Sequence, residues 1–172
     1  MELTFERRER PFREPHRVAY GTIRARELIE ITLTDADGVR GRGEAAPLES
    51  YDGVPTAAVL SALGAYRAVC ATPGTPGGPI LIDRCREVAD LPQALAAIDI
   101  ALWDLAGQRA GKPVCALLAE HPAAEIAVNA TISASGPDAA AAAAAAAIRA
   151  GYDCIKLKVG VGDDLERVRS VR

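Results

Sequence analysis

Hydrophobic and polar residues alternate along the first part of the chain, which is the pattern of β-strands with one buried face. In residues 27–45, ELIEITLTDADGVRGRGEA, the alternation centres on Leu28, Ile29, Ile31 and Leu33. The run DADG at 35–38 interrupts it and is typical of a turn, and the strand pattern resumes at Val39. We therefore predict antiparallel β-structure over residues 1 to about 50, with a hairpin at this turn.

The hydrophobic period changes to that of a helix after about residue 55. Val59, Leu63 and Tyr66 fall on one stripe, and Pro55 suits a first helical turn. Residues 71–79, ATPGTPGGP, are predicted to form a loop because they are rich in Gly and Pro.

The clearest helical pattern covers residues 91–110, LPQALAAIDIALWDLAGQRA. Apolar residues recur there every three or four positions, at Leu95, Ile98, Leu102 and Leu105. Asp90 and Gln93 are a candidate capping pair at its start, and Gly111 with Pro113 ends it. Packing alone explains this helix, without a chemical role.

From about residue 123 the pattern becomes strand, helix, strand and helix. EIAVNATIS, at 125–133, predicts a strand that ends near Thr131. The alanine-rich run at 136–151 predicts a helix that Asp138 caps and Gly151 ends, with disorder as the alternative.

The next segments complete a repeating unit. Residues 152–160 predict a strand, and residues 161–172 begin a helix with Asp163 or Asp164 near its start. Two strands joined through a helix in this way must be parallel.

Composition narrows the class of protein. The chain has 172 residues, of which 49% are hydrophobic and 25% charged, with a net charge of −3, as in ordinary globular proteins. The acidic balance argues against nucleic acid or an anionic membrane as a partner, and no apolar run approaches the ~20 residues of a membrane span. The N-terminal segment MELTFERRERPFREP is charged throughout, unlike a signal peptide, so we expect a cytoplasmic protein.

The cysteines and histidines are not spaced along the sequence in a pattern typical of a metal site. Buried reduced thiols are expected, with metal ligation or disulfides as alternatives, at Cys70, Cys85, Cys115 and Cys154. His16 and His121 have no second histidine at ligand spacing.

The segment GYDCIKLKVG, at 151–160, places two lysines in a predicted strand. Lys156 and Lys158 alternate with apolar residues, so both amines point to one face, about 7 Å apart. In a covered parallel sheet this face is the interior of a closed barrel, where crowding and burial favour the neutral form of one amine. A neutral lysine is a general base, and the pair would need carboxylates or a bound substrate nearby. The alternative is an edge strand with solvated lysines.

Four segments together resemble the muconate lactonizing enzyme subgroup of the enolase superfamily. AIDIALWDLAGQRAGKPVCALL (97–118) is similar to the signature helix, and DADGVRGRGEAAPL (35–48) to the hairpin of the capping domain. GYDCIKLKVG resembles the K-x-K motif, and DDLERVRSVR (163–172) the helix that follows it. The resemblance covers essentially the whole chain, in order and at the expected spacing.

The resemblance implies an α+β capping domain at 1–122, followed at 123–172 by the first two βα units of a (β/α) TIM-like barrel that stays incomplete in this chain. It implies an active site at the C-terminal ends of the barrel strands, closed by loops of the capping domain. It also implies the chemistry of this superfamily, in which a base removes the proton α to a carboxylate and Mg²⁺ stabilises the enediolate.

By the same resemblance, Lys158 would be the catalytic base, and Lys156 would support it electrostatically and reach the substrate carboxylate. Thr131 matches a substrate-contacting position, with a strand-end threonine without a ligand as the alternative. Tyr20 and Tyr51 lie in the segments that correspond to the specificity loops, at about 16–24 and 47–53, and are pocket candidates unless they only pack or face solvent.

The family's metal ligands are acidic residues on the third to fifth barrel strands, and a second lysine lies on the sixth. None of these strands is present, and Asp153, Asp163 and Asp164 fit turn and cap positions better than a metal site. A full barrel takes about 250 residues. We therefore expect either a fragment of a longer protein or a partner chain, no activity from 172 residues alone, and a homo-oligomer at full length.

Substrate specificity is less constrained. Dipeptide epimerases often carry arginine where this chain has Gly21, and YGTIRAREL (20–28) resembles o-succinylbenzoate synthases and N-succinylamino acid racemases. A small carboxylate substrate of that type is predicted, with dipeptide epimerase and muconate cycloisomerase as alternatives. A non-catalytic remnant or a small-anion-binding module is the alternative of another class.

Overall fold

A computed structural model of the chain describes residues 1–74 and 77–172. The chain forms two compact units, which we call the first unit (Met1–Arg10 and Arg26–Pro122) and the second unit (Pro11–Ala25 and Ala123–Arg172). The second unit includes the end of the first β-hairpin, which the hydrophobic pattern does not indicate. The domain limits expected from the sequence stay a prediction.

A three-stranded sheet, in the order β1-β2-β3, begins the chain. Its strands are β1 (Glu2–Val18), β2 (Gly21–Thr34) and β3 (Arg40–Ala45). β2 pairs antiparallel with β3, with Ile29 opposite Ala45 and Thr34 opposite Arg40. The predicted hairpin is therefore confirmed.

The turn between β2 and β3 is stabilised by the side chain of Asp35. Its carboxylate accepts hydrogen bonds from the backbone amides of Asp37 and Val39, at 2.9 and 3.0 Å. Arg109 donates a further hydrogen bond to Asp35 at 2.6 Å. Burial opposes ionisation of Asp35, but these hydrogen bonds outweigh it and lower its pKa.

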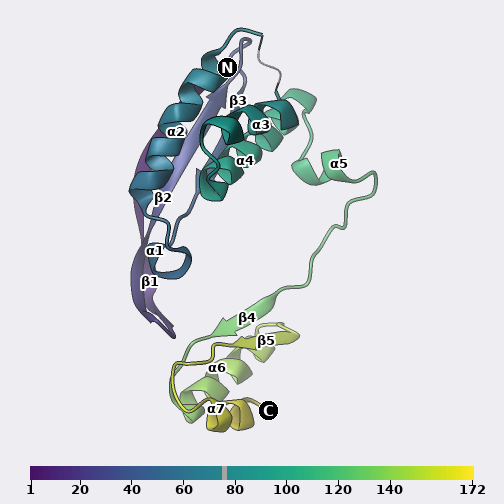
Figure 1. Cartoon of the computed structure of the whole chain (residues 1–172). Coiled ribbons are helices and arrows are strands. Elements are labelled where there is room, and N and C mark those ends of the chain that lie inside the picture. Colours follow the sequence, from purple (N-terminus) through teal and green to yellow (C-terminus); the bar gives the residue numbers. More distant parts are fainter. Residues whose placement is uncertain (75–76) are drawn as a thin grey trace. The chain divides into compact units, whose positions relative to one another are not determined.

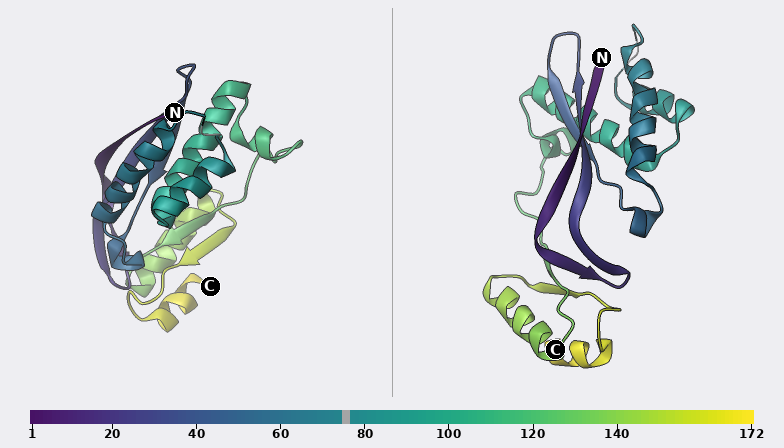
Figure 2. Two further views of the ribbon diagram at one scale, coloured as in Figure 1. Left: turned by 45° about the horizontal axis from the view of Figure 1, so that its top comes forward. Right: turned by 90° about the vertical axis from the view of Figure 1, so that its left-hand side faces the viewer.

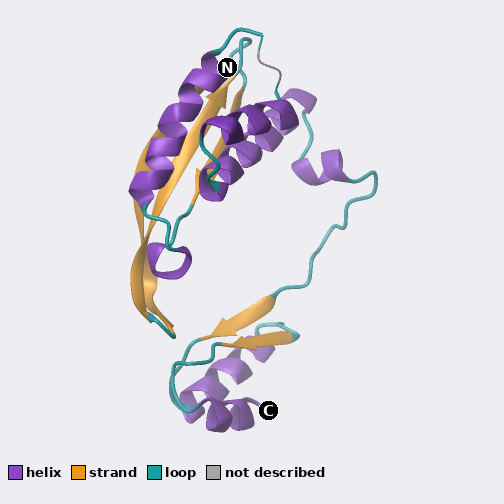
Figure 3. Cartoon of the chain, in the orientation of Figure 1, coloured by secondary structure: helices purple, strands orange, loops and turns teal. Residues whose placement is uncertain are grey.

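Among the described residues of the first unit, five helices follow the sheet (Figures 1 and 3). They are α1 (Glu49–Asp52), α2 (Thr56–Ala71), α3 (Pro79–Val88), α4 (Pro92–Ala110) and α5 (Val114–Leu118). The two helices predicted from periodicity, α2 and α4, are confirmed, with Pro55 at the N-cap position of α2. α3 was not predicted, and residues 75–76 of the expected loop lie outside the described residues.

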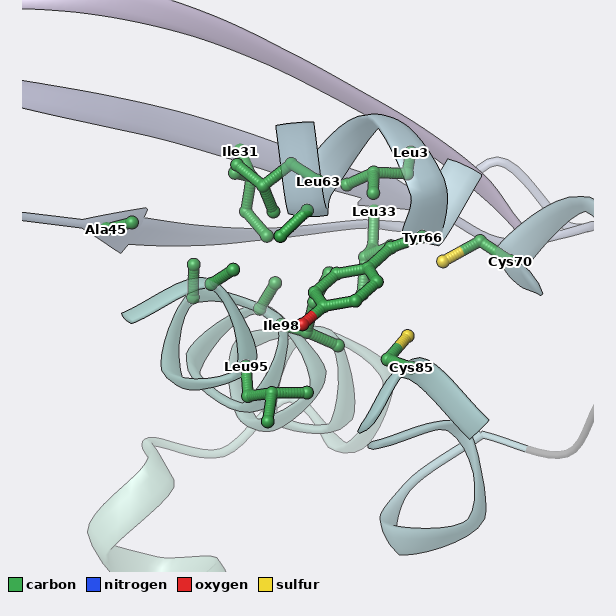
Figure 4. Packing of buried hydrophobic residues seen from close by; sticks show 14 of the residues in the cluster. Leu3, Ile31, Leu33, Ala45, Leu63, Tyr66, Cys70, Cys85, Leu95 and Ile98 are labelled. Atoms are coloured by element: carbon green, nitrogen blue, oxygen red, sulfur yellow. The ribbon is translucent and has the colours of Figure 1, made fainter. Parts of the chain in front are cut away.

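Figures 1 and 2 show α2 and α4 on the same side of the sheet. The core between them is drawn in Figure 4, where Tyr66 of α2 reaches between strand and helix residues. The hydroxyl of Tyr66 donates to the carbonyl of Ala89 at 2.6 Å, and desolvation raises the pKa of Tyr66 to about 12. The predicted burial of Val59, Leu63 and Tyr66 is confirmed.

The two ends of α4 differ in how well the sequence predicts them. Gly111 ends the helix in the left-handed conformation, with φ 62°, and this prediction is confirmed. At the other end Leu91 occupies the N-cap position, and Gln93 donates to Asp52 of α1 at 3.1 Å. The expected capping pair of Asp90 and Gln93 is therefore wrong.

α4 packs directly on the backbone of β3, because two glycines of β3 leave room for it. A Cβ atom added at Gly41 would lie 2.1 Å from the carbonyl oxygen of Ala101, and one added at Gly43 would lie 2.1 Å from that of Ala97. The backbone amide of Arg42 donates to the Asp104 carboxylate of α4 at 2.7 Å. The segment RGRGEA thus has a buried face that consists of small residues.

The second unit contains a strand, helix, strand and helix in sequence: β4 (Asn129–Ile132), α6 (Pro137–Arg149), β5 (Cys154–Leu157) and α7 (Asp164–Val171). β4 and β5 are parallel, as predicted. Figure 2 shows α6 and α7 on one side of this pair of strands. Ala140 and Ala144 of α6 are buried against Ile132, so the helix is confirmed and the alternative of disorder is wrong.

In the second unit, the predicted start of the first strand and the predicted cap of α6 are wrong, whereas the predicted cap of α7 is confirmed. Residues 125–128, expected as strand, are loop (Figure 3). Gly136 occupies the N-cap of α6 with Asp138 inside the first turn, so the expected cap is wrong. Asp163 caps α7 by accepting from the backbone amide of Glu166 at 3.1 Å, as predicted.

Two further predictions concern membrane-spanning segments and the burial of the cysteines. None of the helices in the described part of the chain is both long and apolar enough to cross a membrane. Cys70 and Cys85 are buried and reduced, whereas Cys115 and Cys154 are exposed. The prediction of buried thiols is therefore wrong for Cys115 and Cys154, because the segments around these two cysteines lie at the surface.

Candidate functional site

The face of the β4–β5 pair that lies away from the helices carries the predicted site residues. The register places Thr131 opposite Lys156, and Ile132 opposite Leu157. Residues paired in this way project to the same side of a sheet. Because Ile132 and Leu157 pack in the core of the second unit, Thr131 and Lys156 project from the opposite, polar face.

Lys158 continues this face one residue beyond β5. Its backbone amide donates to the carbonyl of Ile132 at 2.9 Å, so the pairing of the two strands extends to this position. By alternation its side chain lies on the face of Lys156. Lys156 is exposed and Lys158 is half-buried. The two amines therefore share one face, as the alternation predicts, with unequal access to solvent.

Other polar residues lie on the same face and were not identified from the sequence. Asn129 donates from its side-chain amide to the hydroxyl of Thr131 at 3.3 Å and lies opposite Cys154 in the register. The face that we call the lysine face comprises Asn129, Thr131, Cys154, Lys156 and Lys158. A hydroxyl, an amide and two cations on one face provide donors for an anionic group.

The two tyrosine candidates lie in different units. Tyr20 is in the turn between β1 and β2, within the second unit, and is 47% exposed. The neighbouring Ala19 lies against the backbone that follows Lys158, since a Cβ atom added at Gly160 would be 2.9 Å from the Cβ of Ala19. The structure thus places Ala19 of the predicted loop at 16–24 against the backbone two residues after Lys158. Tyr51 is in α1 of the first unit and is 76% exposed. The substrate-binding roles of both tyrosines stay predictions.

A buried arginine, which the sequence pattern does not reveal as a site residue, links the ends of β4 and β5. Arg167 of α7 is 0% exposed. Its Nε donates to the carbonyl of Ala134, just after β4, at 2.9 Å, and its Nη1 donates to Asp164 at 2.9 Å. Asp164 in turn accepts from the backbone amide of Gly160 at 2.8 Å. This chain of hydrogen bonds connects the backbone after β4 to the backbone after Lys158.

The loop that follows Lys158 packs closely on the backbone beyond β4. A Cβ atom added at Gly162 would lie 2.3 Å from the carbonyl oxygen of Ser135. The Nη2 atom of Arg167 is buried and has no hydrogen-bond partner among the described residues. A buried donor without a partner is costly, so Arg167 is suited to one further acceptor. The sequence signal for this residue was its position three residues after Asp164 on a predicted helix.

Comparison with known proteins identifies the family. The family model described as "Mandelate racemase / muconate lactonizing enzyme, N-terminal domain" matches residues 1–119. The chain belongs to this family. The predicted resemblance to the muconate lactonizing subgroup of the enolase superfamily is thereby confirmed, as is its α+β capping domain.

Three similar proteins illustrate the relationship within the mandelate racemase and muconate lactonizing enzyme family. A hydrophobic dipeptide epimerase of Enterococcus faecalis is 30% identical over 168 residues, which are 93% of this chain and 46% of the epimerase. An N-succinyl-L-Arg/Lys racemase of Bacillus cereus is 29% identical over 170 residues, 94% of this chain and 45% of the racemase. The crystal structure of a dipeptide epimerase from E. faecalis, in complex with Mg and the dipeptide L-Leu-L-Tyr, superimposes with a TM-score of 0.86 at 28% identity, covering 99% of this chain and 49% of that one. The chain spans about half the length of the curated relatives that it matches.

Candidate metal ligands are not clustered in the described part of this family member. Within residues 1–74 and 77–172, His, Cys, Asp and Glu residues nowhere gather in a group of three that could hold a metal ion. Asp163 caps α7, and Asp164 is bonded to Gly160 and Arg167. These two acids therefore have structural roles, as predicted, and we assign no metal-dependent step to them.

We predict that Arg167→Met loosens the loop after Lys158. Loss of the two charge-assisted hydrogen bonds frees Asp164 and the backbone at Gly160, so hydrogen exchange of amides 158–163 should rise about tenfold or more. Exchange followed by mass spectrometry measures this directly. Arg169→Met is the matched control, because Arg169 lies on the same helix and forms an exposed pair with Glu166 at 2.8 Å. Equal exchange in both variants and the wild type would contradict the role of Arg167.

Proposed function

We propose that this chain supplies the capping domain, residues 1–122, and the lysine-bearing start of the barrel, residues 123–172, of an enzyme that removes the proton α to a carboxylate. The observation that carries the proposal is the lysine face. Lys156 of β5 and Lys158, one residue beyond it, fall on the same face by alternation, β5 is parallel to β4, and Thr131 lies opposite Lys156. This arrangement supports Lys158 as the base and Lys156 and Thr131 as groups that bind the substrate.

The use of lysine supports a chemical role for the pair. Only three of the 20 basic Lys and Arg residues of the chain are lysines, namely Lys112, Lys156 and Lys158. An arginine side chain stays protonated in proteins, whereas a lysine can give up its proton and act as a base. The half-buried Lys158 suits proton transfer, and the more exposed Lys156 suits attraction of the substrate carboxylate.

For the substrate, we propose an amino acid whose α-nitrogen is acylated. The relatives include a racemase of N-succinyl-L-Arg/Lys and an epimerase of hydrophobic dipeptides, and both names describe an amino acid with an amide on its α-nitrogen. The α-proton of such a molecule lies next to a carboxylate or a peptide carbonyl, where an anion can be delocalised. Gly21 and the segment at 20–28 lead us to favour N-succinylamino acids within this class.

Other activities of the family remain alternatives to this substrate class. An o-succinylbenzoate synthase is also among the relatives, and the segment at 20–28 fits it as well. Dipeptide epimerase and muconate cycloisomerase are the further alternatives. A small-anion-binding module without catalysis is the alternative of another class, and the exposed position of Lys156 is the observation that favours it.

Several parts of the proposal lie outside these residues. Magnesium would be held by residues beyond 1–172 and, when bound, would stabilise negative charge on the substrate carboxylate. The barrel strands would come from the same polypeptide or a second chain, and we expect a cytoplasmic homo-oligomer for the complete enzyme. Because the chain spans about half of its relatives, we expect no turnover from residues 1–172 alone.

The proposal is tested by exchange of the substrate α-proton with solvent deuterium, followed by NMR in the presence of Mg²⁺. The substrates are N-succinylamino acids, dipeptides and the precursor of succinylbenzoate. The chain completed with a barrel portion should catalyse exchange with at least one N-acylated amino acid, and residues 1–172 alone should not. Exchange by the 172-residue chain would refute the need for a barrel portion. Failure of the completed protein on every substrate would refute the proposed function.

A further inference from the structure

The core of the first unit contains two cysteines whose sulfur atoms face each other. Cys70 lies in the last turn of α2 and Cys85 lies within α3, and their exposed fractions are 1% and 0%. Figure 4 shows both sulfurs projecting into the space between the two helices. The two thiol groups lie close enough for a hydrogen-bonding interaction between them to shift both pKa values. Two buried thiols that face each other from neighbouring helices are candidates for a disulfide.

We propose that Cys70 and Cys85 are a modification site at which a low-molecular-weight disulfide oxidises the chain to an intramolecular disulfide. The Cys70 sulfur attacks one sulfur of the small disulfide, whose S–S bond breaks and releases one small thiol. The Cys85 sulfur then attacks the Cys70 sulfur of the mixed disulfide and releases the second small thiol. The two protein thiols are oxidised, and the small disulfide is reduced to two thiols that carry the two hydrogens.

The electrostatic surroundings assign the order of attack. The hydrogen bond from Cys85 lowers the pKa of Cys70 despite burial, and the nearby N-terminal ammonium of Met1 lowers it further. The same hydrogen bond, together with burial and the charge of Cys70, raises the pKa of Cys85. Cys70, which lies at the helix end and beside the Met1 ammonium, is therefore assigned as the attacking thiol. Once Cys70 is capped by the small thiol, it no longer repels charge on Cys85, which can then resolve the mixed disulfide.

The location of Cys70 near a helix end provides a route for the oxidant. α2 ends at Ala71, and the following Thr72 is exposed. The carbonyl of Cys70 accepts a hydrogen bond from the ammonium group of Met1 at 2.8 Å, so opening of this last turn requires release of that group. Helix ends open more readily than helix interiors, so the oxidant should reach Cys70 before Cys85 and at a rate limited by this opening.

The test uses the 172-residue chain with Cys115→Ser and Cys154→Ser, because the exposed cysteines would otherwise form mixed disulfides. Under native conditions with oxidised glutathione, the intact mass should fall by two hydrogens, and peptide mapping should link Cys70 to Cys85. The closed loop should raise the melting temperature by about 5 °C, and a thiol reductant should reverse both changes.

Single variants in the same background serve as controls. Cys85→Ser should accumulate a glutathione adduct at Cys70, whereas Cys70→Ser should react much more slowly at Cys85. The denatured chain is oxidised under the same conditions for comparison. If Cys70 and Cys85 stay as thiols in the native chain while the denatured chain is oxidised, the proposal is overturned, and the two residues only pack against each other. A stable glutathione adduct in place of the internal disulfide would overturn it as well. Because the assay measures no enzymatic activity, its outcome is independent of the proposed function.

Discussion

Replacing Gly43 with alanine is expected to lower the free energy of unfolding of the first unit by about 3 kcal/mol, at the upper end for an overpacked site. The added Cβ would lie 2.1 Å from the carbonyl oxygen of Ala97 and 3.0 Å from the amide nitrogen of Ala101. Both atoms belong to the backbone of α4, so no side-chain rotation can relieve the clash. α4 must move away from β3, which separates it from the core shared with α2.

Urea denaturation followed by circular dichroism measures this effect, with Gly64→Ala as the matched control. Gly64 lies in the middle of α2, is exposed, and has open space around an added Cβ. Alanine is the better helix former, so this variant should gain about 0.5–1 kcal/mol. Gly41→Ala should behave like Gly43→Ala, and the double variant should cost less than the sum, because one shift of α4 relieves both clashes. If Gly43→Ala were as stable as the wild type, the close packing of α4 on β3 would be wrong.

Replacing Lys158 with alanine in the completed enzyme is expected to reduce kcat by about 10³-fold, the typical contribution of a general base. The fold should be retained, because Lys158 is tied to β4 through its backbone amide rather than its side chain. Lys156→Ala should mainly raise KM, since Lys156 is assigned to the substrate carboxylate. Circular dichroism and steady-state kinetics on the same preparations separate loss of catalysis from loss of structure.

Lys112→Ala is the matched control for both variants. Lys112 is the third lysine of the chain, is exposed, and follows α4 in the first unit. It should leave kcat and KM near their wild-type values. Near-normal turnover of Lys158→Ala would remove Lys158 as the base, and an equal loss in all three variants would point to a general effect of charge.

The sequence predicts those elements that have a regular hydrophobic pattern or a clear turn signal. α4, the hairpin at Asp35 and the parallel β4–β5 unit follow from local periodicity and turn chemistry. α3 escaped prediction because its buried positions, Leu81 and Cys85, are few and follow a Gly- and Pro-rich segment. The N-caps of α4 and α6 were misassigned because proline in the first turn sets the start of both helices, whichever polar residue lies nearby.

Contacts between distant segments account for what the sequence could not predict. Gly41 and Gly43 alternate with charged residues, so their buried face is invisible until α4 is known to pack on it. The shared face of Lys156 and Lys158 was predictable, since alternation along a strand is a local property. Arg167 was not, because its partner Ala134 and the Gly160 amide that bonds to Asp164 are brought together only by the fold of the second unit.

The most direct test of the central claim, that the lysine face is the part of the active site that this chain supplies, is a crystal structure of the completed protein with an N-succinylamino acid bound. We predict that Nζ of Lys158 lies about 3–3.5 Å from the substrate α-carbon, with Lys156 at the carboxylate. A structure in which both amines extend into bulk water, with the substrate bound elsewhere, would contradict the account.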